Sequence, residues 1–428
     1  MNANQVMYRC VWRWHFYAGL LCLPIVLFLA VSGGLYLFKP QIESFRESSY
    51  MDLSVSGERQ SVNDHIVAAQ SAFPDTLFHR YRIPKQDNDA VRVSVFSEDI
   101  RYFVYVNPYS LEIVDIVRFD RLFTELLKDL HESVFLGSIG SYFVELAACW
   151  AIVLFVTGII LWWPRDASGM AGVLYPRLSL EGRRFWKDLH VVIGFWISIL
   201  ALFLLISGLP WTQGWGGAFQ KTRKVIESHV QQDWSTGAKK EHVHWHVNSV
   251  EKAEIDEIAY QKAVALNFDY PVMLSVDNAH HNSWKVSSQT QNRPRRADAW
   301  IDGYSGETLR SQAFSERKMV DKIIGYGIAA HEGQLFGWFN LALGVLTTLG
   351  LVLMSVSGFI LWWKRKPQGA LGAPKSTGQP IANTMIAVLV VSSLLLPLLL
   401  VSVVTIFLVE FVVLRHLPPA RRWLGLAQ

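Results

Sequence analysis

The chain has 428 residues, of which 51% are hydrophobic and 18% are charged, and its formal net charge is +4. So apolar a composition argues against a soluble enzyme, and so small a net charge gives no indication of nucleic-acid binding. Five windows contain no charged residue, namely 16–38, 146–163, 191–220, 333–363 and 381–409. Each reaches the roughly 18 apolar residues at which a membrane-spanning helix becomes the default interpretation. The sequence therefore predicts a polytopic α-helical membrane protein.

The first window is expected to be an uncleaved span rather than a signal peptide. Its apolar run exceeds a typical signal-peptide core and ends without a small-residue cleavage site. The three cysteines, Cys10, Cys22 and Cys149, lie in or beside the apolar windows. Disulfides are therefore not expected to hold the polar segments together.

Short polar segments between the windows are rich in arginine and lysine, which places them on the cytoplasmic side of a membrane. The two long polar segments are then external modules. The expected organisation is the N-terminus and first span (1–38), the first module (39–142), the second span (143–163), a cytoplasmic loop (164–187), the third span (188–213), the second module (214–332), the fourth span (333–363), another cytoplasmic loop (364–380), a last apolar segment (381–413) and a tail (414–428).

The last apolar segment leaves two possibilities open. A single crossing would place the basic tail, with Arg415, Arg421 and Arg422, on the external side, against the rule for basic segments. Pro397 lies in the middle of the segment, where it interrupts a helix, so a re-entrant hairpin is the alternative.

An internal repeat relates the first half of the chain to the second. A shift of 175 positions aligns Arg9 with Arg184, His15 with His190, Gly19 with Gly194, and Ser32-Gly33 with Ser207-Gly208. A shift of 200 positions aligns His131-Glu132 with His331-Glu332, Gly137 with Gly337, Gly158 with Gly358, and the Ile-Leu-Trp-Trp runs at 160–163 and 360–363. The repeated unit is span, module, span. Because both units start inside, a pseudo-two-fold axis along the membrane normal is expected.

Each external module is expected to be a small α+β domain. The first has a helix over 61–73, capped by Ser61, followed by alternating strands and a turn at 107–110. The second has a helix over 249–266, capped by Ser249, followed by strands and a turn at 302–306.

Four of the 13 histidines fall on the repeat: His15 and His190 near the inner ends of their spans, and His131 and His331 near the outer ends. Two imidazoles at equal depth about a two-fold axis are what bis-histidine ligation of haem requires, so two non-covalent b-type haems are expected.

Other residues near these histidines fit the same interpretation. Arg9 and Arg184 could neutralise haem propionates, and Gly19 and Gly194 would leave room for a flat porphyrin. The alternative is that polar residues near helix ends lie in the membrane interface and bind nothing.

The outer pair raises a question of length. His131 and Trp163 are 32 residues apart, which is ~48 Å of straight helix and more than a ~30 Å hydrocarbon core holds. Either the outer histidines project beyond the membrane, or residues 137–140 and 333–337 break the helix and fold it back.

The His-Glu pairs do not indicate a zinc protease. Phe135 and Leu335 occupy the place of the second histidine of HExxH. Glu132 and Glu332 are interpreted as partners that orient their neighbours or as solvated helix-end acids.

Other polar residues carry weaker signals. His242, His244 and His246 alternate as on one strand face, which predicts a metal or substrate patch, with a solvated loop as the alternative. His65 and His79 are expected at the surface. Glu145 marks either polar traffic or a helix end.

Several motifs resemble the PepSY-associated transmembrane family over roughly residues 8–366. They are Arg9-x-x-x-Arg13-Trp14-His15, Asp188-Leu189-His190, His331-Glu332-Gly333, and the two Ile-Leu-Trp-Trp runs, which continue as Pro-Arg and Lys-Arg. Members of that family studied as ferric-siderophore reductases of the bacterial inner membrane bind haem and reduce ferric iron on the periplasmic side. The resemblance implies His15, His131, His190 and His331 as axial ligands of haem iron. It also implies a ferric siderophore or other ferric chelate as substrate.

The sequence does not identify the electron donor. The chain has no nucleotide-binding glycine loop, so a built-in flavin or nicotinamide domain is not expected, and a cytoplasmic reductase or a quinol would supply electrons. A PepSY-based binding or regulatory protein without redox activity is the alternative class. A metal permease is disfavoured because the apolar windows contain no charged residue.

Overall fold

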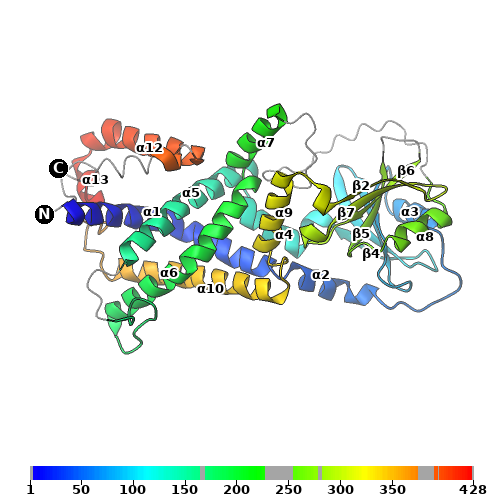
Figure 1. The fold of residues 1–428 in the computed structure, drawn as a ribbon, viewed down its shortest axis with the longest axis horizontal. Helices are drawn as coiled ribbons and strands as arrows, with labels where there is room; N and C mark the ends of the chain where they lie inside the picture. The colour runs from blue at the N-terminus through cyan, green and yellow to red at the C-terminus, as the bar shows by residue number, and fades with distance from the viewer. Residues whose placement is uncertain are drawn as a thin grey trace. The chain divides into compact units, whose positions relative to one another are not determined.

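The computed structural model describes residues 3–163, 169–226, 254–277, 282–374, 390–393 and 395–426. It contains two compact units, each built from segments of both halves of the chain (Figure 1). The membrane unit comprises Met1–Leu35, Asp129–Lys239 and Ala342–Gln428. The sheet unit comprises Tyr36–Lys128 and Lys240–Leu341.

Among the described residues, five helices are long and apolar enough to cross a membrane. They are α1 (Ala3–Tyr36), α5 (Gly137–Trp162), α6 (Gly182–Gly208), α10 (Trp338–Trp363) and α12 (Pro397–Leu408), the last of which continues as a candidate span to His416. Their mean hydropathy over the most apolar window is 2.0 to 2.7. The prediction of a multi-pass α-helical membrane protein is confirmed.

The spans pack through small side chains. Ala151 and Phe155 of α5 and Ile197 and Ala201 of α6 form one buried cluster. Small residues let helix backbones approach closely, which matters in lipid because burial of apolar surface does not by itself drive helices together. The three cysteines are free thiols.

The C-terminal segment returns to the end of the membrane unit where α1 begins. After α12 the chain continues through η6 (Val409–Val413), η7 (Leu414–His416) and α13 (Pro418–Leu424). The Tyr17 hydroxyl donates to the Leu424 carbonyl at 2.5 Å, and Arg13 Nη1 donates to the Gly425 carbonyl at 3.0 Å. Figure 1 marks both chain ends at this end of the unit.

The other end of α12 lies beside the middle of α5. Trp150 Nε1 donates to Ser402 Oγ at 3.1 Å, and Trp215 Nε1 donates to the Leu395 carbonyl at 3.1 Å. Pro397 stands in the first turn of α12, where its missing N–H costs no helical hydrogen bond. The choice between a hairpin and a single crossing depends on residues 381–389 of the segment, which lie outside the described residues.

The two predicted modules share one eight-stranded antiparallel sheet. The strands are β1 (Leu77–Arg82), β2 (Val91–Ser97), β3 (Ile100–Val106), β4 (Ile113–Arg118), β5 (Val272–Asp277), β6 (Ser283–Ser288), β7 (Ala297–Asp302) and β8 (Thr308–Ala313), in the order β4-β3-β2-β1-β5-β6-β7-β8. Tyr81 pairs with Leu274 and Arg82 with Met273 where the modules meet. The sequence predicted two separate domains, whereas joining β1 to β5 removes two exposed strand edges.

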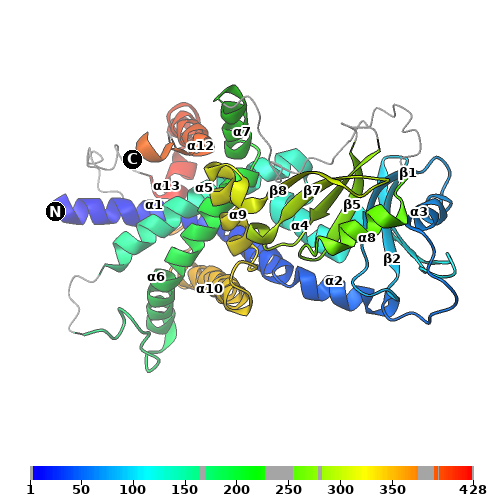
Figure 2. The ribbon, with the colours of Figure 1, turned by 45° about the vertical axis from the view of Figure 1, so that its right-hand side comes forward.

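Two helices cover one face of this sheet, α3 (Val62–Gln70) and α8 (Glu257–Ala265), as Figure 2 shows. The predicted Ser61 cap of α3 is confirmed, because Ser61 Oγ accepts from the Asp64 N–H at 3.1 Å. The second helix begins later than predicted. Residues 254–256 precede it without helical structure, Asp256 occupies its N-cap, and Ser249 lies outside the described residues.

The core beneath these helices follows the alternation of the strands. Val91, Val93 and Val95 are fully buried on one face of β2, and Trp284 and Val286 of β6 join the same cluster. The two predicted turns are also present. Asn107 Oδ1 accepts from the Tyr109 N–H at 2.9 Å, and Asp302 Oδ1 accepts from the Ser305 N–H at 2.7 Å.

The remaining helices connect the units or border the sheet. They are α2 (Lys39–Glu47), α4 (Phe123–Ser133), α7 (Trp215–Ile226) and α9 (Met319–His331), with single turns η1 (Ser48–Tyr50), η2 (Phe119–Arg121), η3 (Leu209–Trp211), η4 (Arg293–Arg295) and η5 (Phe314–Glu316). Glu47 at the end of α2 is buried against the sheet, where its carboxylate meets Arg82 at 2.8 Å and Arg92 at 3.2 Å.

Candidate functional site

His15 lies on α1 and faces α5. Its Nδ1 is 3.1 Å from the Leu154 carbonyl oxygen and 3.1 Å from Thr157 Oγ1. A carbonyl only accepts hydrogen bonds, so Nδ1 carries the hydrogen and the lone pair of the neutral ring lies on Nε2. Within the described parts of the chain, Nε2 has no hydrogen-bond partner. The ring is thus oriented by one nitrogen and leaves the other available.

His190 repeats this arrangement on α6 and α10. Its Nδ1 is 2.9 Å from Ser357 Oγ, and that hydroxyl donates to the Met354 carbonyl at 3.2 Å, so it accepts from the ring. The partner hydroxyls, Thr157 and Ser357, are 200 positions apart, as are the repeat-matched residues of these spans. The two imidazoles are within electrostatic range of each other.

His131 lies on α4 and packs back against α1. Its Nδ1 is 3.1 Å from the Leu29 carbonyl oxygen and 3.2 Å from Ser32 Oγ. Burial lowers the pKa of His131, so the ring is neutral at physiological pH. Its Nδ1 therefore also carries the hydrogen, as in His15.

The chain reaches this position because α4 and α5 are separate helices. The break contains Val134 and Phe135 and is followed by Gly137, and the φ values of these three residues are 50°, 61° and 57°. A corresponding break, with Gly333 and Gly337 at φ 73° and 59°, separates α9 from α10. Of the two alternatives for the outer pair, the structure shows a broken and folded-back helix for His131, but the break lies at 134–136 and not at 137–140, which belong to α5. Along α1, the 17 residues from His15 to Ser32 place the two sites roughly 25 Å apart.

Glycines of the neighbouring helix lie beside each of these rings. A Cβ at Gly158 would lie 3.2 Å from His15 Cε1, one at Gly358 would lie 3.4 Å from His190 Cε1, and one at Gly33 would lie 2.8 Å from His131 Cε1. Gly19 and Gly194, which were expected to make room for a porphyrin, instead pack against Leu154 and Met354.

The other predicted site residues are His331, the two arginines and the three histidines at 242, 244 and 246. His331 is the last residue of α9 and belongs to the sheet unit. Arg9 and Arg184 are exposed near the starts of α1 and α6, and neither forms an ion pair within the described residues. His242, His244 and His246 lie outside the described residues.

The family model named PepSY-associated TM region matches residues 12–365. The chain belongs to this family. No curated protein matches the chain. The match to this PepSY-associated region covers all four repeat histidines and the shared sheet. The histidine sites described above therefore lie in the part of the chain that the family model matches.

Glu145 of this PepSY-associated chain has a structural role that the sequence left open. It is fully buried, its Oε2 accepts from the Gly214 N–H at 2.7 Å, and its Oε1 accepts from the Trp215 N–H at 2.9 Å. A carboxylate at a helix N-terminus satisfies free N–H groups and complements the helix dipole. Glu145 therefore fixes the start of α7 to α5.

His65 is not at the surface as predicted. Its side chain is fully buried in the sheet unit, where Nε2 is 3.1 Å from the Pro108 carbonyl oxygen and Nδ1 is 3.4 Å from the Tyr81 hydroxyl. Burial, assisted by the charge of Arg59, lowers the pKa of His65 to about 4. His65 is thus a neutral core residue that ties α3 to the turn at Asn107, and His79 is half-buried against Phe96.

Proposed function

We propose that the chain is a haem-containing transmembrane electron-transfer protein that reduces ferric chelates, such as ferric siderophores, outside the membrane. The observation that carries this proposal is the hydrogen bonding of the His15 and His190 rings. Each ring has Nδ1 held by the neighbouring helix and Nε2 without a partner among the described residues. Histidines that bind metals commonly donate their other N–H to a carbonyl or hydroxyl, which fixes the tautomer and the orientation of the ring.

The donor set fits a b-type haem. Ligation by two neutral imidazoles is common in electron-transfer haems, whose iron stays six-coordinate. We assign His15 and His190 to an inner haem on the strength of their matching partners, Thr157 and Ser357. We assign His131 and His331 to an outer haem by the symmetry of the repeat. Arg9 precedes His15 on α1, and Arg184 precedes His190 on α6. These two arginines are assigned to the haem propionates.

When bound, haem supplies a one-electron carrier that the bilayer itself lacks. His15 with His190, and His131 with His331, would hold the two irons, and the positions of His15 and Ser32 on α1 lie roughly 25 Å apart. Leu154, Thr157 and Ser357 hold the inner rings, and Leu29 and Ser32 hold His131.

The substrate follows from the chemistry of iron. Hard oxygen ligands bind ferric iron tightly, and reduction to the ferrous ion weakens that attraction because the charge falls. The sheet unit, placed in the periplasm of a bacterium, would present the chelate to the outer haem. Electrons would come from a cytoplasmic reductase or from a quinol in the inner membrane.

Internal duplication belongs to the same proposal. Support comes from the 200-residue spacing of Thr157 and Ser357 and from the order of the sheet, which is symmetric about the β1–β5 junction. With the basic segments inside, the N-terminus is cytoplasmic. The tail then obeys the same rule, because it lies beside Arg13 and Tyr17.

A reduced-minus-oxidised absorbance spectrum of the purified protein, with haem counted per chain, tests this proposal. We expect two haems per wild-type chain and one in His15→Ala or His190→Ala. His416→Ala removes an exposed imidazole of the C-terminal segment and is the matched control, expected to keep both. A protein without a Soret band after haem-replete expression would refute the proposal.

A binding or regulatory role is the second candidate, and one feature of the sheet unit favours it. Strand β8 is an edge of the shared sheet and is largely exposed, so it could pair with a strand of another protein. A colourless protein that still binds a partner through β8 would support this role against electron transfer.

A further inference from the structure

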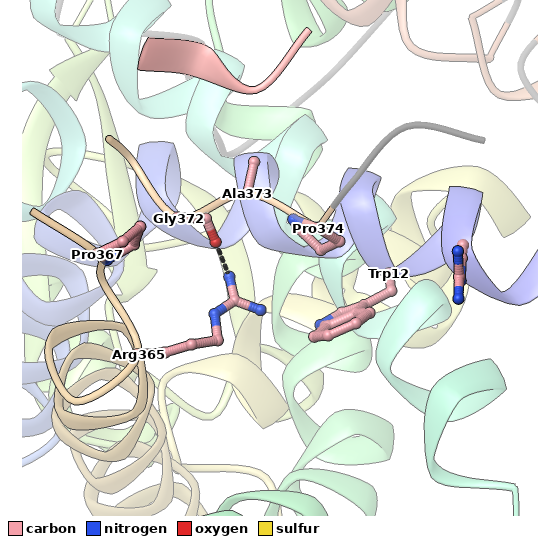
Figure 3. Close-up of a pocket in the computed structure, with 7 residues that line it drawn as sticks. Trp12, Arg365, Pro367, Gly372, Ala373 and Pro374 are labelled. Carbon is pink, nitrogen blue, oxygen red and sulfur yellow. Dashed lines mark hydrogen bonds between the residues drawn. The ribbon is translucent and has the colours of Figure 1, made fainter. Parts of the chain in front are cut away.

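A pocket opens in the membrane unit beside the start of α1 (Figure 3). Its walls are Arg9 and Trp12 of α1 together with Arg365, Pro367 and residues 372–374, which follow α10. Its volume is about 390 Å³. This volume falls within the range of pockets that hold small molecules, roughly 300 to 1,000 Å³.

The pocket is positively charged. Arg9 and Arg365 both line it, and none of the described residues around it is acidic. Arg183 adds a third charge nearby, since burial and the charge of Arg183 together lower the pKa of Arg365. Arg9 has neither an ion-pair nor a hydrogen-bond partner within the described residues. A pocket lined by two arginines and by no carboxylate favours an anionic ligand.

One wall of the pocket is aromatic. The guanidinium carbon of Arg365 lies 5.1 Å from the Trp12 ring centroid and 4.9 Å from that of Phe16, and Arg365 also donates to the Gly372 carbonyl. Figure 3 shows the guanidinium between the indole and residue 372. A cation held over aromatic rings suits a ligand that is charged at one end and apolar at the other.

The position of the pocket agrees with such a ligand. The candidate spans of α1 and α10 begin at Gln5 and end at Trp363, so Trp12 and Arg365 lie near one boundary of the apolar segments. Tryptophan and basic residues at that depth are typical of the headgroup region, and basic pockets between spans bind anionic lipid headgroups.

We propose that this pocket binds the phosphate of an anionic phospholipid, such as phosphatidylglycerol. Arg9 and Arg365 contact the phosphate, and the acyl chains run beside Trp12 and Phe16. The lipid thereby links α1 to the segment after α10, which Arg13 already joins through the Pro374 carbonyl. Inorganic phosphate shares the anionic chemistry but gains nothing from the aromatic wall. For Arg9 this assignment competes with the assignment to a haem propionate, and the experiment below distinguishes the two.

Native mass spectrometry of the full chain, released from nanodiscs, tests the proposal. Wild-type protein is expected to retain phosphatidylglycerol in preference to phosphatidylcholine. Arg9→Gln and Arg365→Gln should each weaken that binding about fivefold, because one basic residue at a membrane surface contributes about that factor. Arg184→Gln is the matched control. It removes the exposed arginine at the repeat-equivalent position, which does not line the pocket, and should retain the lipid.

Two outcomes would overturn the proposal, and a further variant controls for folding. If Arg9→Gln and Arg184→Gln bind lipid equally well but each loses haem absorbance, the arginines serve propionates and not a lipid. If inorganic phosphate added to phosphatidylcholine nanodiscs protects the wild-type protein against heating as well as phosphatidylglycerol does, the ligand is a free anion. Arg365→Lys keeps the charge and should retain binding, which separates loss of charge from loss of folding in Arg365→Gln.

Discussion

At the scale of single residues, the histidines were visible in the sequence and the groups that orient them were not. His15 and His190 stood out because a shift of 175 positions aligns identical residues. Thr157 and Ser357 are equally matched in position, but a threonine opposite a serine is not an identity, although both supply a hydroxyl. The Leu29 and Leu154 carbonyls carry no signal at all in the sequence, because every residue has one.

Gly33→Ala is expected to displace His131. The added Cβ would lie 2.8 Å from His131 Cε1, closer than carbon atoms pack, so the ring must move away from Leu29 and Ser32. Haem titration should show a loss of about 10-fold or more in affinity at the outer site, the range found when partners of metal-binding histidines are removed. Gly19→Ala is the control on the same helix, because its Cβ would make an ordinary 3.5 Å contact with Leu154. Equal haem binding in both variants would contradict the assignment of His131.

The buried His65 predicts how the sheet unit responds to pH. Its pKa falls from 6.5 to about 4 on folding, so folding favours the neutral ring. The stabilisation is complete above pH 6.5 and is lost as the pH falls from there towards 4, by up to about 3 kcal/mol. Thermal unfolding of His65→Gln should therefore depend less on pH over this interval than that of the wild type. His416→Gln, which removes an exposed imidazole, should retain the wild-type dependence.

At the scale of elements, local patterns predicted the helices and turns well and missed long-range pairing. Charge-free windows located the spans. Glycines marked the helix breaks: Gly137 adjoins the break that brings His131 back to α1, and Gly333 and Gly337 lie in the break between α9 and α10. The β1–β5 pairing joins Tyr81 to Leu274, which are far apart in the chain. Alternation shows that a strand has a buried face, but it does not show which strand lies beside it.

Glu145→Ala is expected to loosen α7. The substitution removes the carboxylate acceptor of the partly buried Gly214 and Trp215 N–H groups, and hydrogen bonds to a charged group contribute about 1.5–3 kcal/mol. Hydrogen exchange should speed up in α7 and remain unchanged in α9. Glu145→Gln keeps one acceptor oxygen and should have an intermediate effect. Uniform exchange across both helices in all three proteins would show that Glu145 does not cap α7.

At the scale of the whole molecule, the distribution of basic residues predicts an orientation for the first four spans, and the basic tail disagrees with it if the last apolar segment crosses the membrane once. Pro397 and the contacts of Leu395 and Ser402 with Trp215 and Trp150 place the start of α12 beside α5. The chain then runs back towards α1, so the basic tail joins the other basic segments. Sequence composition alone did not distinguish these paths, because both bury the same apolar residues.

Side-specific labelling of the C-terminus would decide between the two paths. A reporter fused after residue 428 is expected on the same side as Cys10, near the start of α1, because Arg13 and Tyr17 hold the Gly425 and Leu424 carbonyls. Replacing both side chains, in Arg13→Gln with Tyr17→Phe, should raise protease access to α13 and leave the reporter on that side, because two hydrogen bonds do not determine which side of a membrane a chain end occupies. Arg415→Gln, in the exposed part of the segment, should change neither. A reporter on the opposite side from Cys10 in the wild type would show that the last apolar segment crosses once, and that the basic tail is an exception to the charge rule.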